Sequence, residues 1–272
     1  MTISARSMRG ERRPCLRTTN HMSSWSKRRR LTYLTVIIVV LVGAIIVPGF
    51  FIFYRAPTCF DGIKNGNEQG IDCGGGCQRL CPSAFLPPSV AWARFENVAP
   101  SLYNVGAYVV NPNIDGEAMD VPYHAALYDA QGGFITEFTG TVTLPPHRNT
   151  LAFKGSVNVG KRIPAKALFE FSGIPDWHKR ADPLAALVIG DKDYAEDDSG
   201  SSLAVTIKNA SVHAIDNVGV SVVLYDKDGN AIGFSHTTID EIPGSGQATA
   251  PFTWPENRHG AVISIEVLPV AE

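Results

Sequence analysis

The stretch Val218-Gly-Val-Ser-Val-Val-Leu-Tyr-Asp226 is the clearest indication of the fold, because its apolar residues alternate along the chain. Val218, Val220, Val222 and Leu224 occupy every second position, which places them on one face of a pleated strand. An apolar face of this kind is buried against another layer of structure. The stretch therefore predicts one strand of a sheet with a packed inner face.

The same pattern occurs about one domain length earlier, in Val121-Pro-Tyr-His-Ala-Ala-Leu-Tyr-Asp129. In both copies the Leu-Tyr-Asp sequence is followed by a turn that contains glycine. A further match joins Ala165–Phe171 to Ala261–Val267, with a slightly different spacing. Loop insertions between corresponding strands produce such small differences, so two copies of one domain are the simplest explanation.

Other segments of the chain also have the composition of strands and are separated by clusters of Pro, Gly, Asn and Asp. They cover residues 102–110, 133–143, 149–159, 165–171, 184–189, 202–208, 230–239, 246–254 and 261–268. No amphipathic helix is predicted beyond residue 54. Strands at this spacing predict antiparallel sandwiches of about seven strands each.

The Leu-Tyr-Asp strand, the glycine turn and a proline-containing turn together resemble the FxLYD-type domain, an immunoglobulin-like sandwich of bacterial and archaeal envelope proteins. The second copy matches better, whereas Pro112 and Pro122 depart from the pattern in the first. The resemblance implies two tandem immunoglobulin-like sandwiches and no particular activity. The repeat residues are expected to be structural: Leu127 and Leu224, the packing tyrosines Tyr128 and Tyr225, and the turn-capping Asp129 and Asp226.

An uncharged apolar segment precedes the sandwiches. Residues 31–54 carry no charged side chain and directly follow Lys27-Arg-Arg-Arg30. A helix of this length, at about 1.5 Å per residue, spans the roughly 30 Å hydrocarbon layer of a bilayer. The net charge of −2 combines a basic N-terminal stretch with an acidic remainder. The positive-inside rule therefore predicts a cytoplasmic N-terminus and extracytoplasmic domains. The alternative is a cleaved signal peptide, although the apolar region of such peptides is usually shorter.

Four of the five cysteines lie just beyond this segment, at Cys59, Cys73, Cys77 and Cys81. Outside the cytoplasm an even number of clustered cysteines predicts disulfides, and four cysteines allow three pairings that spacing does not distinguish. A zinc site is the alternative, but the close C-x2-C pairs that such sites favour are missing. We therefore predict two disulfides.

The sequence from Cys59 to Cys77 resembles a motif of secreted and surface-attached bacterial proteins, C-x-D-G-x-x-N-x-x-E-x-x-x-D-C-G-G-x-C, and that resemblance implies a small stapled extracellular module. Oxygen ligands for Ca²⁺ are present at Asp61, Asn65, Glu68 and Asp72, without the spacing of an EF-hand loop. The alternative, which we favour, is that these side chains cap turns by accepting hydrogen bonds from backbone N–H groups.

No catalytic constellation is visible in the sequence. No histidine pair has the spacing of a helical H-E-x-x-H metal site. Asp198-Ser199-Gly200 lacks a G-x-S-x-G nucleophile elbow and is expected in a solvated loop. The protein is therefore not expected to be an enzyme.

Three further features have both a structural and a functional interpretation. The acidic residues Asp191, Asp193, Glu196, Asp197 and Asp198 are expected in a loop between two strands, with a Ca²⁺ site at the inter-domain junction as the alternative. Asn209-Ala-Ser211 matches a glycosylation acceptor. The tryptophans Trp92, Trp177 and Trp254 are expected in the sandwich cores rather than at binding surfaces.

The predicted organisation is a disordered basic cytoplasmic tail, a transmembrane helix, a Cys-rich module, a linker, a first sandwich, a second linker and a second sandwich. Their boundaries are 1–30, 31–54, 55–82, 83–89, 90–173, 174–182 and 183–272. The two sandwiches are expected to form a rod that holds a distal surface several nanometres from the bilayer.

We expect a single-pass, membrane-anchored, extracytoplasmic protein that acts without catalysis in binding, adhesion or envelope organisation. The alternative is an accessory subunit of a membrane secretion or transport complex. The expected partners are the lipid bilayer and a surface protein or glycan of unknown identity. Nucleic acid is not expected, because the basic tail has no predicted fold and almost no aromatic residues. No cofactor is expected, apart from Ca²⁺ as the alternative described above.

Overall fold

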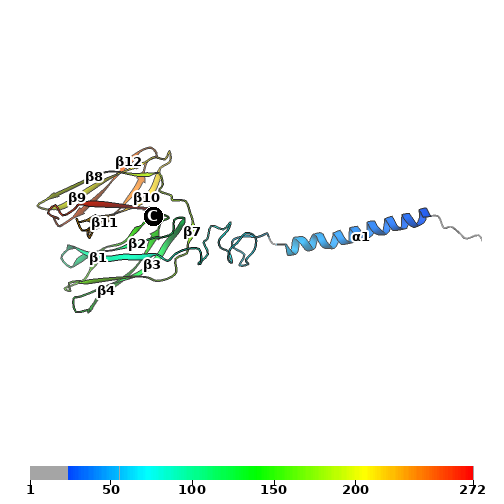
Figure 1. The fold of residues 1–272 in the computed structure, drawn as a ribbon, viewed down its shortest axis with the longest axis horizontal. Coiled ribbons are helices and arrows are strands. Elements are labelled where there is room, and N and C mark those ends of the chain that lie inside the picture. Colours follow the sequence, from blue (N-terminus) through cyan, green and yellow to red (C-terminus); the bar gives the residue numbers. More distant parts are fainter. Residues whose placement is uncertain (1–23, 55, 272) are drawn as a thin grey trace, which may run out of the picture. The chain divides into compact units, whose positions relative to one another are not determined.

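The computed structural model describes residues 24–54 and 56–271, and its fold is mainly β (Figure 1). The chain divides into two compact units, Met1–Pro57 and Thr58–Glu272. The first contains an apolar helix, and the second contains the Cys module and all of the described strands. Most of the basic tail, residues 1–23, lies outside the described residues.

The helix α1 covers Ser24–Phe53 and is long and apolar enough to cross a membrane, a property that signal sequences share. It begins before the predicted Leu31, because Lys27–Arg30 continue the same helix. Hydroxyl groups on its apolar surface are satisfied locally: Thr32 Oγ1 donates to the Arg28 carbonyl at 2.9 Å. A helix in lipid needs such internal hydrogen bonds, since no water is present to replace them.

The first sandwich contains six main strands in two antiparallel sheets, β1-β2-β5 and β4-β3-β6. Its strands are β1 (Ser89–Ala99), β2 (Leu102–Val110), β3 (Gly116–Tyr128), β4 (Phe134–Leu144), β5 (Thr150–Asn158) and β6 (Lys166–Phe171). The sequence did not indicate β1, and it predicted about seven strands for each sandwich. The six strands still bury one face of each sheet against the other, which is what a sandwich requires.

The second sandwich repeats this arrangement strand for strand, with sheets β8-β9-β12 and β11-β10-β13. Its strands are β8 (Leu187–Asp197), β9 (Gly200–Asn209), β10 (Ile215–Tyr225), β11 (Ala231–Ile242), β12 (Gln247–Trp254) and β13 (Ser264–Ala271). The strands β3 and β10 occupy equivalent places, because each pairs with the following strand and with the last strand of its own sandwich. The identical pairing order supports two copies of one domain.

The predicted inward faces are confirmed in both copies. Val121, Tyr123, Ala125 and Leu127 are buried in the first sandwich. The equivalent residues of the second copy, which run from Val218 to Leu224 at alternate positions, are also fully buried and belong to one cluster of apolar side chains. Trp177 and Trp254 are buried in the cores of the first and second sandwich, as expected, whereas Trp92 is half-buried between the two sandwiches and not in a sandwich core.

The two sandwiches pack side by side, so that the outer face of sheet β1-β2-β5 lies against the outer face of sheet β11-β10-β13. Figure 1 shows the result as four layers, with β3 and β4 on one outside and β8, β9 and β12 on the other. The expectation of a rod is therefore wrong. Apolar side chains on the outward faces of β2, β10 and β11 account for the difference, because burying them requires a facing sheet.

The Cys module is held together by the disulfides Cys59–Cys77 and Cys73–Cys81, which confirm the predicted pair of cross-links. Its turns depend on glycine at one point in particular. Gly75 has a φ of +60°, and a Cβ there would overlap the Asn67 carbonyl oxygen. The two cross-links overlap along the chain, which compensates for the small core of the module.

The segment predicted as a linker between the sandwiches, residues 174–182, connects three parts of the unit. Trp177 is fully buried in the core of the first sandwich, and the strand β7 (His178–Lys179) pairs with the start of β3. The Cys module joins the same segment, because the Leu80 N–H donates to the Trp177 carbonyl at 2.7 Å. Arg79 adds an ion pair with Asp176 at 2.8 Å.

Candidate functional site: the junction between the sandwiches

We call the packed region between the two sandwiches the junction. At its centre the ring of Phe234 from β11 lies near Trp92 of β1, with the ring centroids 5.9 Å apart. Gly106 of β2 provides the space, since a Cβ at that position would lie 2.7 Å from the Phe234 ring. The junction residues are Tyr108, Leu151, Val223, Ala231, Phe234 and Leu268, with Trp92, Val110, Phe153 and Tyr225 half-buried around them.

One carboxylate joins the sandwiches at the junction. Tyr108 of β2 donates its hydroxyl to Glu266 of β13 at 2.8 Å, and Tyr225 of β10 donates to the other oxygen of Glu266 at 2.8 Å. Burial, followed by the hydrogen bond to Glu266, raises the pKa of Tyr108 to about 12. The pKa of Tyr225 is raised by the same causes in the same order. Both hydroxyls therefore remain protonated donors at any physiological pH.

A second polar contact crosses the junction at its edge. Glu96 of β1 forms an ion pair with Arg258 of the β12–β13 connection, and both side chains are largely buried. Burial lowers the pKa of Arg258. Arg94 donates to the Ala231 carbonyl at 2.6 Å. These contacts fix how one sandwich is placed against the other.

Two clefts lie beside the junction, and each takes residues from both sandwiches. The larger, of about 710 Å³, is lined by charged side chains that include Arg94, Glu96, Lys166 and Arg258. The smaller, of about 350 Å³, is lined by three threonines together with Asp120 and His236. Both clefts exist only because the sandwiches are held side by side.

One pair at the junction has the residue types of a nucleophile and a base. Ser221 Oγ and His236 Nδ1 share a hydrogen bond of 3.0 Å. Ser221 is only 2% exposed, and the His236 ring stacks on Phe153 with the ring centroids 5.7 Å apart. A substrate carbonyl has no route to a hydroxyl buried in this way, so we interpret the pair as a packing contact.

The Leu-Tyr-Asp residues have different roles in the two copies. Leu127 and Leu224 are fully buried. Tyr128 packs edge-on against Phe134 at 6.0 Å, whereas Tyr225 reaches across the junction to Glu266. The tyrosine of the second copy is thus part of the junction, a role that the sequence did not reveal.

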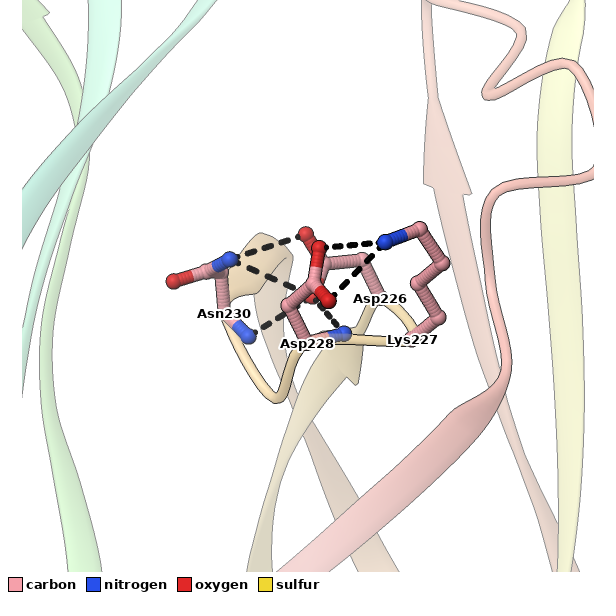
Figure 2. A network of polar contacts seen from close by, with 4 residues as sticks. All are labelled: Asp226, Lys227, Asp228 and Asn230. Carbon is pink, nitrogen blue, oxygen red and sulfur yellow. Dashed lines mark hydrogen bonds and ion pairs between the residues drawn. The ribbon is translucent and has the colours of Figure 1, made fainter.

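The aspartate of the motif organises the following turn, as Figure 2 shows for the second copy. Asp226 accepts hydrogen bonds from the backbone N–H groups of Asp228 (2.9 Å) and Asn230 (2.8 Å). The side-chain bond from Asn230, followed by its backbone N–H, lowers the pKa of Asp226. Asp129 caps its own turn in the same way, through Gln131 and Gly133.

A buried asparagine occupies the same place at the end of β2 and of β9. Asn209 donates from Nδ2 to the carbonyls of His213 (2.8 Å) and Ile242 (3.1 Å) and is only 2% exposed. Asn111 donates to two carbonyls in the equivalent turn of the first sandwich. Glycosylation of Asn209 is therefore excluded in the folded protein, because its amide is enclosed and fully engaged.

The oxygen-rich side chains of the Cys module bind its own backbone. Asp72 accepts from the N–H groups of Asp61 and Gly62 at 2.9 Å, and Glu68 accepts from the Asn65 N–H at 3.2 Å. Asp61 accepts from the Asn65 side-chain amide at 2.9 Å. Turn capping therefore accounts for Asp61, Glu68 and Asp72, whereas the side-chain oxygen of Asn65 is buried without a hydrogen-bond partner. Glu68 also lies close to the sulfurs of Cys59 and Cys77, but these are joined in a disulfide and offer no thiolate.

Most of the acidic residues of the second sandwich are not in a loop, which corrects the sequence-based expectation. Asp191, Asp193, Glu196 and Asp197 belong to β8, an edge strand of the outer sheet away from the junction, and only Asp198 lies in the turn that follows. The hydroxyl of Tyr194 donates to Glu196 at 2.7 Å, and this bond is the main cause of the lowered pKa of Glu196. Charged side chains along an edge strand discourage pairing with another chain.

Comparisons with known proteins leave the family open. No protein-family model matches the chain, and no curated protein matches its sequence. A red sea bream transglutaminase structure is 14% identical over 66% of this chain with a TM-score of 0.23, and a β-glucuronidase of glycoside hydrolase family 2 is 12% identical over 80% with a TM-score of 0.24. This chain spans 29% of the length of each of these proteins.

A tandem carbohydrate-binding module, the N-terminal CBM22-1-CBM22-2 pair of Xyn10C from Paenibacillus barcinonensis, is 6% identical over 68% of this chain and 86% of its own length. Its TM-score is 0.15. Likenesses at this level carry no argument about function, so the residues of this chain must carry it.

Proposed function

We propose that this protein is a single-pass, membrane-anchored, extracytoplasmic binding protein without catalytic activity. Its partner is a surface protein or a glycan, and it binds at the larger of the two clefts beside the junction. The observation that carries the proposal is the packing of two sandwiches into one unit, which positions charged groups of both around one opening. A preformed cleft binds with less loss of conformational freedom than separate domains would.

The anchor and its orientation are argued from α1 and the flanking charges. The basic cluster Lys27–Arg30 precedes the apolar part of the helix, and the acidic remainder of the chain follows it. Cytoplasmic flanks of membrane helices carry an excess of Lys and Arg. The disulfides of the Cys module agree with this orientation, because disulfides persist outside the reducing cytoplasm.

The larger cleft suits a polar partner. Arg94 and Lys166 of the first sandwich and Arg258 of the second line it together with Glu96 and Glu256. Side chains of both charges can form hydrogen bonds with the hydroxyl groups of a glycan or with peptide groups. The specificity comes from the way in which the charged side chains of the cleft are arranged relative to the polar groups of the partner. Glu96 and Arg258, which both line this cleft, also form an ion pair that joins the two sandwiches.

The orientation is tested by adding protease to intact cells that carry the full chain. We expect degradation of the sandwiches and protection of an epitope placed before α1. Protection of the sandwiches, or their free release into the medium as after signal-peptide cleavage, would contradict the proposed anchor.

The binding function is tested by proximity labelling from a tag at the C-terminus of the full chain in living cells. The variant Arg94→Glu/Lys166→Glu reverses two charges of the cleft, and Lys208→Glu reverses one on the exposed face of β9 as a control. We expect a defined set of surface partners that the double variant loses and the control keeps. Partners that survive the double variant would exclude the cleft, and a stoichiometric membrane complex labelled by all three proteins would favour an accessory subunit instead.

A further inference from the structure

The Cys module exposes three large apolar side chains. Phe60 is 93% exposed, Ile71 is 61% exposed and Ile63 is 55% exposed. Apolar side chains that are exposed together on one small module commonly mark a surface that contacts a partner or a membrane. These three residues take no part in the clusters of buried apolar side chains described for the sandwiches.

These side chains are carried by a cross-linked turn rather than by a loose loop. Phe60 follows Cys59, whose disulfide to Cys77 fixes the start of the turn. The carboxylate of Asp72, next to Ile71, accepts hydrogen bonds from the N–H groups of Asp61 and Gly62. The segments 60–63 and 71–72 are therefore held beside each other, and folding leaves their apolar side chains in water.

The acidic groups of the same turn are directed at its own backbone. Asp72 binds two N–H groups, and Asp61 accepts from the N–H of Ile63 at 3.0 Å and from the Asn65 amide. Lys64, beside Ile63, adds a positive charge. A turn with engaged carboxylates, exposed apolar side chains and a lysine has the character of segments that enter a lipid headgroup layer.

The length of the chain identifies which lipid surface is available. Cys59 is the fifth residue after Tyr54 in the chain. Since an extended chain covers at most about 3.4 Å per residue, Cys59 lies within roughly 17 Å of Tyr54. The headgroup region on each side of the hydrocarbon layer is itself about 5–8 Å thick. If α1 spans the bilayer with Tyr54 at its outer end, the outer headgroup layer is within reach of the turn.

We infer that Phe60, Ile63 and Ile71 insert into the outer leaflet of the membrane that α1 crosses, so that the Cys module contacts lipid directly. The inference rests on the proposed anchor. Aromatic and aliphatic side chains at this depth exchange water for acyl chains, while the polar backbone of the turn stays among headgroups. The module then supports the two sandwiches on the membrane surface.

The test uses the full chain reconstituted into phosphatidylcholine vesicles that contain lipid brominated near the top of the acyl chain, which quenches nearby tryptophan. Trp25→Phe removes the tryptophan of α1, and Phe60→Trp then adds a reporter in that background. The matched control is Ile163→Trp, at a site that is 75% exposed in the β5–β6 connection of the first sandwich. Mass spectrometry under non-reducing conditions confirms both disulfides in each variant.

We expect brominated lipid to quench the added emission of Phe60→Trp at least twofold more than that of Ile163→Trp, and acrylamide in the water to show the reverse order. Equal quenching of both reporters by acrylamide, with none by lipid, overturns the inference. Emission from the Phe60→Trp reporter that is shielded from both quenchers also overturns it and indicates a second copy of the chain as the cover. Flotation of the vesicles tests the anchor separately, because protein that fails to float contradicts the proposed function rather than the lipid contact.

Discussion

Glu266 illustrates how much of the junction depends on single residues. Its two carboxylate oxygens accept one tyrosine hydroxyl from each sandwich. A hydrogen bond to a charged acceptor contributes about 1.5–3 kcal/mol, more than a neutral bond. The residue lies in the Ala261–Val267 repeat, yet no pattern in the sequence indicated this role, because the partners come from different copies.

The variant Glu266→Gln is expected to lower the free energy of unfolding by about 2 kcal/mol, since the amide keeps one acceptor oxygen and presents an N–H₂ to the other tyrosine. Urea denaturation followed by tryptophan fluorescence measures the change. Glu137→Gln is the control, because Glu137 is exposed and its carboxylate pairs with the half-buried His124. Equal losses in both variants would remove the special role assigned to Glu266.

The same contact predicts a dependence on alkaline pH. The pKa of Tyr108 is raised from 10.0 to about 12 in the folded protein, so the folded state holds this proton more tightly than the unfolded state. The contribution is fully present below about pH 10 and is lost as pH rises through about 12. Urea midpoints between about pH 8 and 11.5 should fall more steeply in the parent protein than in Tyr108→Phe. Parallel curves would contradict the raised pKa.

The buried asparagines give a matched test in the two copies. Asn209→Ala and Asn111→Ala each leave carbonyl groups without donors inside a closed turn, and each is expected to lower the free energy of unfolding by about 2–4 kcal/mol. Asn158→Ala, which removes one exposed contact to the Gly160 N–H, should change it by less than about 1 kcal/mol. Thermal or urea unfolding measures these changes. A small loss of unfolding free energy in both Asn209→Ala and Asn111→Ala would show that water replaces the missing side chain.

At the scale of elements, alternation in the sequence predicted which face of β3 and β10 is buried, and that prediction is confirmed. The environment of the opposite face differs between the copies. Pro122 of β3 is exposed and His124 is half-buried, whereas Gly219 and Ser221 at the equivalent places of β10 are buried. The continuous burial of β10 reflects sheets on both of its sides, as a near-continuous apolar run indicates. Pro122 departs from the repeat on a face that has no covering sheet.

The elements missed or misplaced by the sequence have physical reasons. The strand β1 mixes charged and apolar residues, because Arg94 and Glu96 serve the junction rather than water. The strand β8 was predicted too short, since its second half is acidic and resembles a loop. Both lie at sheet edges, where burial constrains composition least.

Phe234 tests the separation between junction and core. Phe234→Ala removes the ring at the centre of the junction, and Phe252→Ala makes the same change in the core of the second sandwich; both residues are 3% exposed. Each should lower the free energy of unfolding by about 3–5 kcal/mol. In calorimetry we expect Phe234→Ala to separate one cooperative unfolding transition into two, because the sandwiches lose their coupling. When Phe252→Ala is added to Phe234→Ala, in which the sandwiches are uncoupled, it should lower the unfolding temperature of the second sandwich alone. A single transition in Phe234→Ala would mean that other contacts maintain the coupling.

For the whole molecule, composition predicted the order of helix, Cys module and sandwiches along the chain, but it did not predict that the two sandwiches pack against each other. The sequence indicated an apolar helix, a disulfide module and two sandwiches. It did not indicate the side-by-side packing, which depends on a few outward residues such as Gly106 and Phe234. Nor did it choose the pairing of the four cysteines, because spacing alone leaves three connectivities open.

Reduction of the protein should affect the Cys module alone. Dithiothreitol opens Cys59–Cys77 and Cys73–Cys81, and we expect rapid proteolysis between residues 58 and 82 with little change in the β signal of circular dichroism. The sandwiches contain no disulfide among their described residues, so their cores do not depend on the cross-links. Loss of the β signal on reduction would show that the module supports the sandwiches through the segment that carries β7.

The side-by-side packing is heterologous: each sandwich uses a different one of its two sheets. The first sandwich buries sheet β1-β2-β5 in the junction and leaves the outer face of β4-β3-β6 uncovered. The second buries β11-β10-β13, the equivalent of β4-β3-β6, and leaves β8-β9-β12, the equivalent of β1-β2-β5, uncovered. Heterologous contacts do not close on themselves, so the same contact repeated on either outer sheet would add further sandwiches and form a fibre. The outward positions that such a copy would meet are polar, with Thr249 and Thr253 on β12 and Glu137 and Thr139 on β4. We expect that replacing these side chains with valine or phenylalanine would promote association between copies through the outer sheets.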